Sequence, residues 1–162
     1  MTFTEAWDMG LCPIPLRQRQ KVPLMPWKRY QTERPTREQC AEWDRRFLDP
    51  KLGMPYNLGL VTGAISNLVV VDADTPTQVE WCKQHLPITL MVLTGRGRHF
   101  YYQANTPCER NARATRFDVR GEGGYVVGPG STHENGTIYT LVTPWQDLTT
   151  LPVFNEGWFY LE

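Results

Sequence analysis

The sequence has no net charge and no hydrophobic run long enough to cross a membrane. Its 162 residues carry 17 Lys and Arg against 17 Asp and Glu, which excludes the proteins that hold nucleic acids through overall positive charge. No apolar run approaches the ~20 residues of a membrane-spanning helix. The opening residues, MTFTEAWDMG, show neither the basic start nor the apolar stretch of a secretion signal. We therefore expect a cytoplasmic protein with no membrane partner.

Several common site motifs are also missing. The four cysteines, at positions 12, 40, 82 and 108, form no Cys-x-x-Cys pair and no Cys/His cluster with zinc spacing. They are interpreted as buried thiols in a reducing compartment. There is no Gly-Lys-Ser/Thr phosphate loop, and no Gly-x-Gly-x-x-Gly links a strand to a helix. The sequence thus excludes the P-loop and dinucleotide-binding classes of protein. Its hydrophobic content of 41% is enough to form the core of one packed domain.

Charge is distributed unevenly along the chain. Residues 12–51 carry ten Lys and Arg against five acids, residues 94–120 carry six Arg against two acids, and residues 121–162 carry five acids and no Lys or Arg. Basic segments on both sides of an acidic middle are typical of a protein that grips a polyanion locally. For any single basic segment, a solvated helix or loop surface is the simpler explanation.

The pattern of apolar residues and turn formers predicts an α+β fold. Helices are expected over 3–9, from Thr36 with a Thr36–Gln39 capping box, and from Thr75-Pro76 to Leu86. Strands are expected over 57–61, 67–71, 89–93, 99–103, 117–120, 125–127 and 138–142, the first two as a hairpin. We expect one domain over 1–162, with a small N-terminal α/β lobe (1–56) and a strand-rich core (57–162).

The sharpest local feature is Leu68-Val-Val-Val-Asp72-Ala-Asp74. The apolar run predicts a central strand buried on both faces. Strand periodicity places Asp72 and Asp74 on one face, where two carboxylates repel each other unless a cation joins them. Hard oxygen ligands of this kind suit Mg²⁺. The alternative is structural: Asp74 could cap the helix that starts at Thr75-Pro76, and Asp72 could simply end the strand.

Two further segments carry polar groups near glycines. Thr94-Gly-Arg-Gly97-Arg98-His99 offers guanidinium and imidazole groups where glycines allow a close approach to phosphate, although an ordinary glycine turn with exposed arginines fits the same residues. Asp118 stands on a short strand between Phe117 and Val119, so it faces away from the core. It becomes a third carboxylate of the pair only if its strand adjoins theirs.

In their order, these segments resemble the bifunctional primase–polymerase (prim-pol) family of the archaeo-eukaryotic primase superfamily. That family carries Asp-x-Asp/Glu, small-x-His and hydrophobic-Asp/Glu motifs, matched here by Asp72-Ala-Asp74, Gly97-Arg-His99 and Phe117-Asp118. The resemblance covers roughly Trp7 to Trp145. Further matches are Lys21-Val-Pro, Trp27, Asn57-Leu-Gly-Leu-Val-Thr-Gly63, Asp118-Val-Arg-Gly-x-Gly-Gly and Ser131-x-His133-x-x-Gly136-x-x-Tyr139. The family order favours His99 over His133 as the motif histidine.

The resemblance implies an RRM-like antiparallel or mixed palm sheet with packed helices. It implies a DNA primase and DNA polymerase that uses two Mg²⁺ or Mn²⁺ ions in the replication of a phage, plasmid or other mobile element. Asp72, Asp74 and Asp118 would be the catalytic metal ligands. The expected nucleotide-binding residues are Gly97, Arg98, His99 and Arg120, and the expected DNA-binding residues are Lys21, Lys28 and Arg29.

The implied partners are template DNA, a primer, and deoxyribo- or ribonucleoside triphosphates, with a helicase domain or protein as a further partner. Tyr101 and Tyr102 are candidates for sugar selection. Two other hypotheses use the same residues. A non-catalytic module that binds single-stranded DNA or an origin explains the charge pattern equally well, and a metal-dependent nuclease explains the carboxylates but leaves the histidine–arginine turn without a role.

Overall fold

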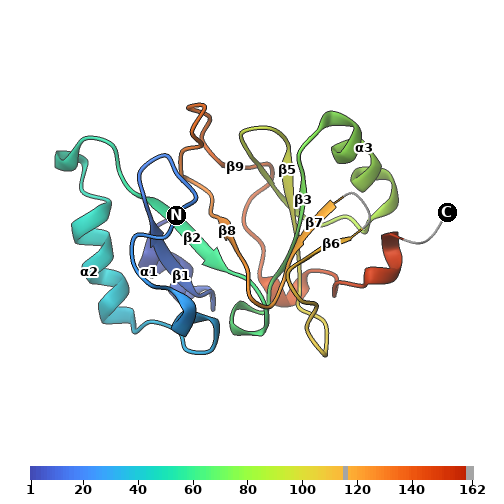
Figure 1. Cartoon of the computed structure of the whole chain (residues 1–162), viewed down its shortest axis with the longest axis horizontal. Helices are drawn as coiled ribbons and strands as arrows, with labels where there is room; N and C mark the ends of the chain where they lie inside the picture. The colour runs from blue at the N-terminus through green and yellow to red at the C-terminus, as the bar shows by residue number, and fades with distance from the viewer. Residues whose placement is uncertain (115–116, 160–162) are drawn as a thin grey trace.

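Two antiparallel sheets stand side by side in the computed structural model, which describes residues 1–114 and 117–159 (Figure 1). The smaller sheet has the order β1 (Pro13–Leu16), β2 (Asn57–Val61), β8 (Tyr125–Val127). The larger sheet has the order β6 (Ala112–Ala114), β7 (Phe117–Arg120), β3 (Val69–Ala73), β5 (Arg98–Tyr102), β4 (Leu90–Leu93), β9 (Thr140–Leu141). The expected α+β class, with an antiparallel palm sheet and packed helices, is confirmed.

Helices cover the outer sides of the two sheets (Figure 1). Helices α1 (Phe3–Asp8) and α2 (Arg37–Phe47) pack by the smaller sheet, and α3 (Pro76–His85) packs on β3 of the larger one. Short 3-10 turns span Lys28–Gln31, Pro50–Leu52, Ala64–Ser66, Leu148–Thr150 and Glu156–Phe159. The expected start of α2 is confirmed, because the hydroxyl of Thr36 accepts a hydrogen bond from the Gln39 backbone N–H at 3.1 Å.

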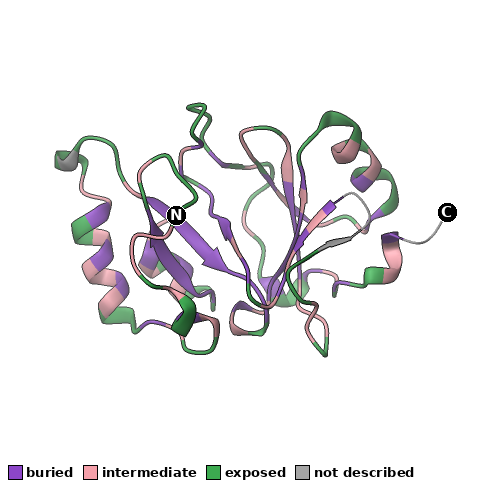
Figure 2. Cartoon of the chain, in the orientation of Figure 1, coloured by how far each residue is buried: buried purple, intermediate pink, exposed green. Residues whose placement is uncertain are grey.

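The apolar side chains form two cores, one on each face of the larger sheet. The inner core fills part of the space between the sheets and joins Leu58 and Leu60 of β2 to Val70, Val92 and Tyr101 of the larger sheet. The outer core lies under α3 and the C-terminal segment, and it contains Val71, Phe100, Phe117, Phe154 and Phe159 among others. The buried residues of both sheets line the middle of the molecule in Figure 2.

Strand β3 is the central element, as its apolar sequence predicts. Val69, Val71 and Ala73 face the outer core and Val70 faces the inner core, each with no exposed surface. Because side chains alternate along a strand, Asp72 shares the inner face with Val70. The same alternation therefore decides that the acidic end of β3 opens between the two sheets and not toward α3.

The predicted hairpin of 57–61 with 67–71 is wrong for the strands, although the turn between them is closed by an antiparallel bridge of Gly63 with Leu68. Strands β2 and β3 belong to different sheets, and the bend between them includes Gly63, whose φ of 100° lies in the left-handed region that glycine accepts readily. A β-carbon at Gly63 would also lie 2.6 Å from a carboxylate oxygen of Glu122. The chain therefore turns into the second sheet here, and β2 pairs with β1 and β8.

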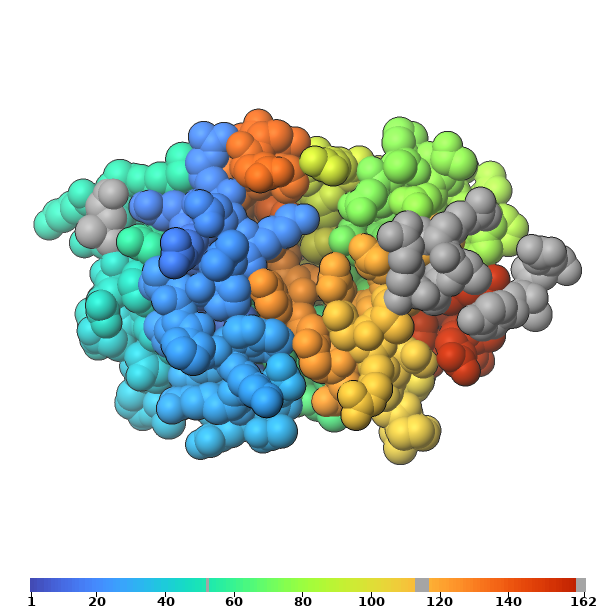
Figure 3. Space-filling model, in the orientation of Figure 1, coloured from blue at the N-terminus to red at the C-terminus, as the bar shows by residue number. Residues whose placement is uncertain are grey.

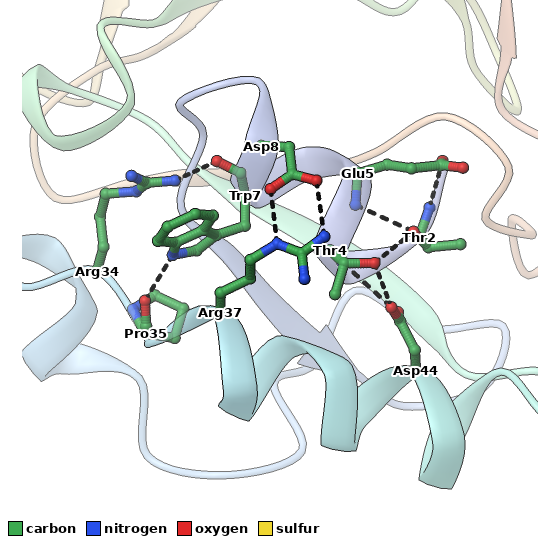
Figure 4. A network of polar contacts seen from close by, with 9 residues as sticks. All are labelled: Thr2, Thr4, Glu5, Trp7, Asp8, Arg34, Pro35, Arg37 and Asp44. Atoms are coloured by element: carbon green, nitrogen blue, oxygen red, sulfur yellow. Dashed lines mark hydrogen bonds and ion pairs between the residues drawn. The ribbon is translucent and has the colours of Figure 1, made fainter.

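A polar network fixes the first helix against α2 (Figure 4). The Asp44 carboxylate accepts hydrogen bonds from the backbone N–H groups of Phe3 at 2.7 Å and Thr4 at 3.3 Å, and from the Thr4 hydroxyl at 2.6 Å. These N–H groups stand in the first turn of α1, where no helical carbonyl can reach them. Asp44 thus supplies from another helix the acceptors that the start of α1 lacks.

We expect Asp44→Ala to lower the free energy of unfolding by about 1–3 kcal/mol, because it leaves two first-turn N–H groups without acceptors. Urea denaturation monitored by circular dichroism measures this change. The matched control is Glu42→Ala on the same helix, which removes only an exposed pair with Arg45 and should change stability by less than about 0.5 kcal/mol. Equal stabilities of the two variants would contradict the proposed contribution of Asp44.

Candidate active site

The acidic residues and the motif histidine meet on three adjacent strands of the larger sheet. Asp72 on β3 lies directly opposite His99 on β5 and directly opposite Asp118 on β7. Directly opposed residues of antiparallel strands point to the same face. Asp118, Asp72 and His99 therefore form a row across the inner face of the sheet, where the two sheets part.

The three carboxylates come close enough to share a cation. One oxygen from each of Asp72, Asp74 and Asp118 lies within 4.8 Å of the other two. Asp72 and Asp118 are half-buried, and Asp74, just after the end of β3, is exposed. The Oδ1 atom of Asp72 is buried and has no hydrogen-bond partner among the described residues. A buried carboxylate oxygen without a donor, beside two further carboxylates, fits the oxygen ligands that Mg²⁺ and Mn²⁺ prefer.

The helix-capping alternative for Asp74 is wrong. The N-cap of α3 is Thr75, whose hydroxyl accepts a hydrogen bond from the Gln78 backbone N–H at 3.1 Å. Asp74 contributes its own backbone N–H to the Gln78 side-chain oxygen, at 2.9 Å. Its carboxylate is therefore not used as the cap of the helix and is available at the mouth of the site.

The pKa values of two of these carboxyl groups are raised. Burial is the main cause for Asp72, with the charge of Asp118 adding to it, while Lys21 and Arg120 act in the opposite direction. The pKa of Asp74 is raised by the loss of surrounding water and then by the charge of Asp72. Both shifts show that the site disfavours its own negative charges, a condition that a bound cation reverses.

His99 is a buried, neutral imidazole. Its Nε2 atom lies 3.6 Å from Asp72 Oδ1, and its Nδ1 atom is buried without a hydrogen-bond partner in the described part of the chain. Burial, with the nearby charge of Lys21, lowers the pKa of His99 to about 3. At neutral pH this residue therefore offers hydrogen bonding beside the carboxylates and no positive charge.

Lys21 and Arg120 bring positive charge to the part of the cleft beside Asp72. Lys21 follows β1, and its backbone carbonyl accepts a 2.5 Å hydrogen bond from the Tyr125 hydroxyl on β8. The Arg120 guanidinium, two residues after Asp118 on β7, lies 3.8 Å from the Asp118 carboxylate. Both side chains line a cavity of about 180 Å³ that also includes Asp72 and His99.

The cleft continues on the other side of the carboxylates. A second cavity, of about 120 Å³, includes Asp74, Arg96 and His133. Beyond it lies a groove of about 670 Å³ between the 18–22 segment and the 132–139 segment. In Figure 3 these segments, blue and orange, touch at the top of the molecule. The Arg19 guanidinium joins them by donating to the Glu134 carbonyl at 2.7 Å. Lys21 and Tyr139 line all three spaces, so they form one cleft.

Not every expected residue faces this cleft. The Arg98 guanidinium contacts Met91 Sδ at 3.6 Å, because Arg98 alternates with His99 and points to the α3 side of the sheet. Gly97 serves packing: a β-carbon there would lie 1.9 Å from the carbonyl oxygen of Ala73. Lys28 and Arg29 are exposed on the 3-10 turn after Trp27.

The two tyrosines considered for sugar selection are both core residues. Tyr101 and Tyr102 have no exposed surface, and the Tyr102 hydroxyl donates to the Pro87 carbonyl on the α3 side at 3.1 Å. Neither lines the cleft cavities described above. Two aromatic residues that do line them are Tyr125 and Tyr139.

Residues 131–139 contribute more to the site than the site motifs alone predict. The Tyr139 ring lies 6.0 Å from the His99 ring and 6.1 Å from the His133 ring, between centroids, so it sits next to both imidazoles. Burial, together with the charges of Asp72 and Asp74, raises the pKa of Tyr139 to about 12. The spacing Ser131-x-His133-x-x-Gly136-x-x-Tyr139 is the sequence signal for this segment, but only the fold places it against the carboxylates.

One of the comparisons with known proteins gives a match. A search of curated proteins found no match. None of the helices in the described ranges is long and apolar enough to span a membrane. The profile of the Prim-Pol family, described as the N-terminal domain of bifunctional DNA primase/polymerases, matches residues 4–153. With the acidic cluster, the cleft and this match over most of its length, the chain belongs to the Prim-Pol family of bifunctional DNA primase/polymerase domains.

Proposed function

We propose that this protein is a DNA-templated nucleotidyltransferase that both makes and extends primers. The observation that supports it most is the carboxylate cluster on the cleft face of a Prim-Pol domain. One carboxylate oxygen from each of Asp72, Asp74 and Asp118 lies within 4.8 Å of the other two. A sheet face with three carboxylates costs stability unless it binds cations. The proposed setting is the replication of a phage, plasmid or other mobile element, with a helicase as partner.

The proposed metal ligands are Asp72, Asp74 and Asp118, which together fit two Mg²⁺ or Mn²⁺ ions. When bound, such ions supply activation of the attacking hydroxyl and stabilisation of charge on the departing pyrophosphate. Asp72 would be the central ligand of this set, because it lies directly opposite Asp118 and its Oδ1 has no hydrogen-bond partner among the described residues. Neutral His99 would hold the Asp72 carboxylate in position from the neighbouring strand.

The proposed nucleotide-binding residues are Lys21, Arg120 and His99. Lys21 and Arg120 bring two positive charges to the cavity beside Asp72, and charge-assisted hydrogen bonds to phosphate are stronger than neutral ones. His99 adds a neutral hydrogen-bonding group. Arg98 takes no part in the proposed site, because its side chain lies on the opposite face of the sheet. Gly97 would act indirectly, by letting the turn before β5 pack against the end of β3.

DNA is proposed to approach along the outer side of the cleft. The Trp27 ring packs edge-to-face on the Tyr125 ring, with centroids 4.9 Å apart, and the exposed Lys28 and Arg29 follow Trp27 on the same turn. Basic side chains beside aromatic rings are typical of surfaces that hold single strands. Lys21, Lys28 and Arg29 are the proposed contacts to the template or primer backbone, so binding should weaken as salt is raised.

Asp72→Asn should abolish templated incorporation. The amide keeps the size of the side chain but removes the charge and one metal-binding oxygen, and we expect a loss of at least about 100-fold. Extension of a labelled primer on a DNA template with Mn²⁺ or Mg²⁺ measures the effect. Asp8→Asn, at an exposed ion pair with Arg37, is the matched control and should keep full activity. Wild-type activity in Asp72→Asn would show that the carboxylate cluster is not the catalytic centre.

Chelation separates an enzyme from a non-catalytic DNA-binding module. With EDTA, primer extension should stop, whereas binding to single-stranded DNA should persist and should fall with rising salt, because phosphate contacts by Lys and Arg need no metal. Restoring Mn²⁺ should restore extension. A wild-type protein that binds DNA but never incorporates nucleotide, with or without metal, would favour the binding-module hypothesis. Shortening of the labelled strand in the same assay would favour the nuclease.

The raised pKa of Asp72 predicts a pH-dependent stability difference. A carboxyl group whose pKa is raised on folding favours the native state when protonated, and this advantage is lost as the pH rises through the native pKa. In EDTA, Asp72→Asn should therefore be more stable than the wild type at neutral pH, and the difference should shrink toward acidic pH. Mn²⁺ should raise the melting temperature of the wild type only. Thermal unfolding across pH tests this, and an Asp72→Asn protein less stable at pH 7 would contradict it.

A further inference from the structure

A second imidazole faces the cleft and has no role in the proposed chemistry. His133 is only 6% exposed, yet it lines both the cavity beside Asp74 and the larger groove beyond it. The Tyr139 ring lies next to both this imidazole and that of His99. A nearly buried polar side chain at the junction of two cavities is placed to meet a ligand that enters either of them.

The hydrogen bond made by its ring decides which nitrogen carries the proton. The backbone N–H of Asn135 donates to His133 Nδ1 at 3.1 Å. A backbone N–H can only donate, so Nδ1 must keep its lone pair, and the neutral ring must carry its proton on Nε2. In this tautomer Nε2 donates a hydrogen bond and cannot ligate a metal ion. Among the described residues nothing accepts a hydrogen bond from Nε2.

The surrounding backbone holds this ring in one place. The Asn135 side-chain amide donates to the Gly95 carbonyl at 2.9 Å and so ties the 133–136 turn to the turn between β4 and β5. The ring packs against Gly95 so closely that a β-carbon there would lie 2.2 Å from it. The φ of Gly95 lies outside the left-handed region, so the glycine serves close packing here and not an unusual backbone conformation.

The chemistry around His133 indicates what it would bind. Lys21 and Arg96 line the same cavity and carry positive charge, and the Lys21 side chain is shared with the larger groove. Glu134, whose backbone carbonyl is held by Arg19, also lines this space, and its negative charge opposes an anion. An N–H donor in a cavity that two cationic side chains also line suits an oxyanion such as a phosphate.

We propose that His133 Nε2–H donates a hydrogen bond to a phosphate oxygen in the cleft, from either the nucleoside triphosphate or the DNA backbone. This inference rests on the proposed function, since both phosphates are substrates of that reaction. It assigns different tasks to the two histidines of the site. His99 lies beside a metal-binding carboxylate, and His133 is a phosphate-binding residue that Gly95 and Asn135 keep in position.

Two isosteric variants separate this role from a purely structural one. His133→Gln keeps an N–H donor near the position of Nε2, whereas His133→Asn reaches only the position of Nδ1 and has no group at Nε2. A lost hydrogen bond to a charged group should weaken phosphate binding about 10- to 100-fold in His133→Asn. His133→Gln should retain most of the affinity. Gly95→Ala should also weaken binding, because its added methyl group displaces the ring.

The measurements use the full chain with Mn²⁺. In one experiment the protein is titrated with a deoxynucleoside triphosphate that has a non-hydrolysable α,β linkage, and in the other with primed DNA. The ligand whose affinity falls in the variants identifies the source of the phosphate. His85→Asn, on the exposed face of α3, is the control and should bind both as the wild type does. Circular dichroism confirms that each variant is folded.

The outcomes distinguish the inference from the proposed function. Weakened binding in His133→Asn and Gly95→Ala, with His133→Gln close to wild type, supports a donor at Nε2. Unchanged binding of both ligands in His133→Asn, or equal losses in the Asn and Gln variants, overturns it while the wild type still extends primers. A wild type that neither binds nor incorporates nucleotide overturns the proposed function and this inference together.

Discussion

The arrangement of the site depends on the register between three strands. Because β3 pairs with β5 on one side and β7 on the other, Asp72 stands directly between His99 and Asp118. A shift of one residue in either pairing would send the partner side chain to the outer core, since side chains alternate along a strand. The apolar residues on each strand, such as Val71, Phe100 and Val119, oppose such a shift, because their burial under α3 requires the observed register.

The same register places an unfavourable group in the interior of the cleft. Asp72 has a buried oxygen without a hydrogen-bond partner in the described part of the chain, and burial, with the charge of Asp118 adding to it, raises its pKa. A structural carboxylate is normally matched by donors in the protein. Here the buried Asp72 oxygen lacks such a donor, so a bound ligand would have to compensate its charge. This is expected of a binding site and not of a contact that stabilises the fold.

The cleft needs both sheets and two very close contacts made by glycines. Lys21 comes from the loop after β1, the carboxylates come from the larger sheet, and the turn carrying His133 comes from the connection between β8 and β9. Because Gly97 has no β-carbon, the turn between β4 and β5 can pack against the carbonyl of Ala73. Because Gly95 has none, the same turn can pack against the His133 ring. Both glycines of the Thr94–His99 segment therefore act by packing, although their sequence pattern also suggests a phosphate-binding loop.

Local structure could be predicted from the residues alone. The apolar run Leu68–Val71 predicts a doubly buried strand, the capping residues predict the helices, and the ordered motifs indicate the family. The tertiary structure decided what depends on pairing between distant segments. Strands β2 and β3 lie in different sheets. Thr75 caps helix α3, so the Asp74 carboxylate is available to the site. The Arg98 side chain points away from the cleft. These outcomes follow from strand register and close packing, which no local pattern encodes, because each requires the position of a residue far away in the chain.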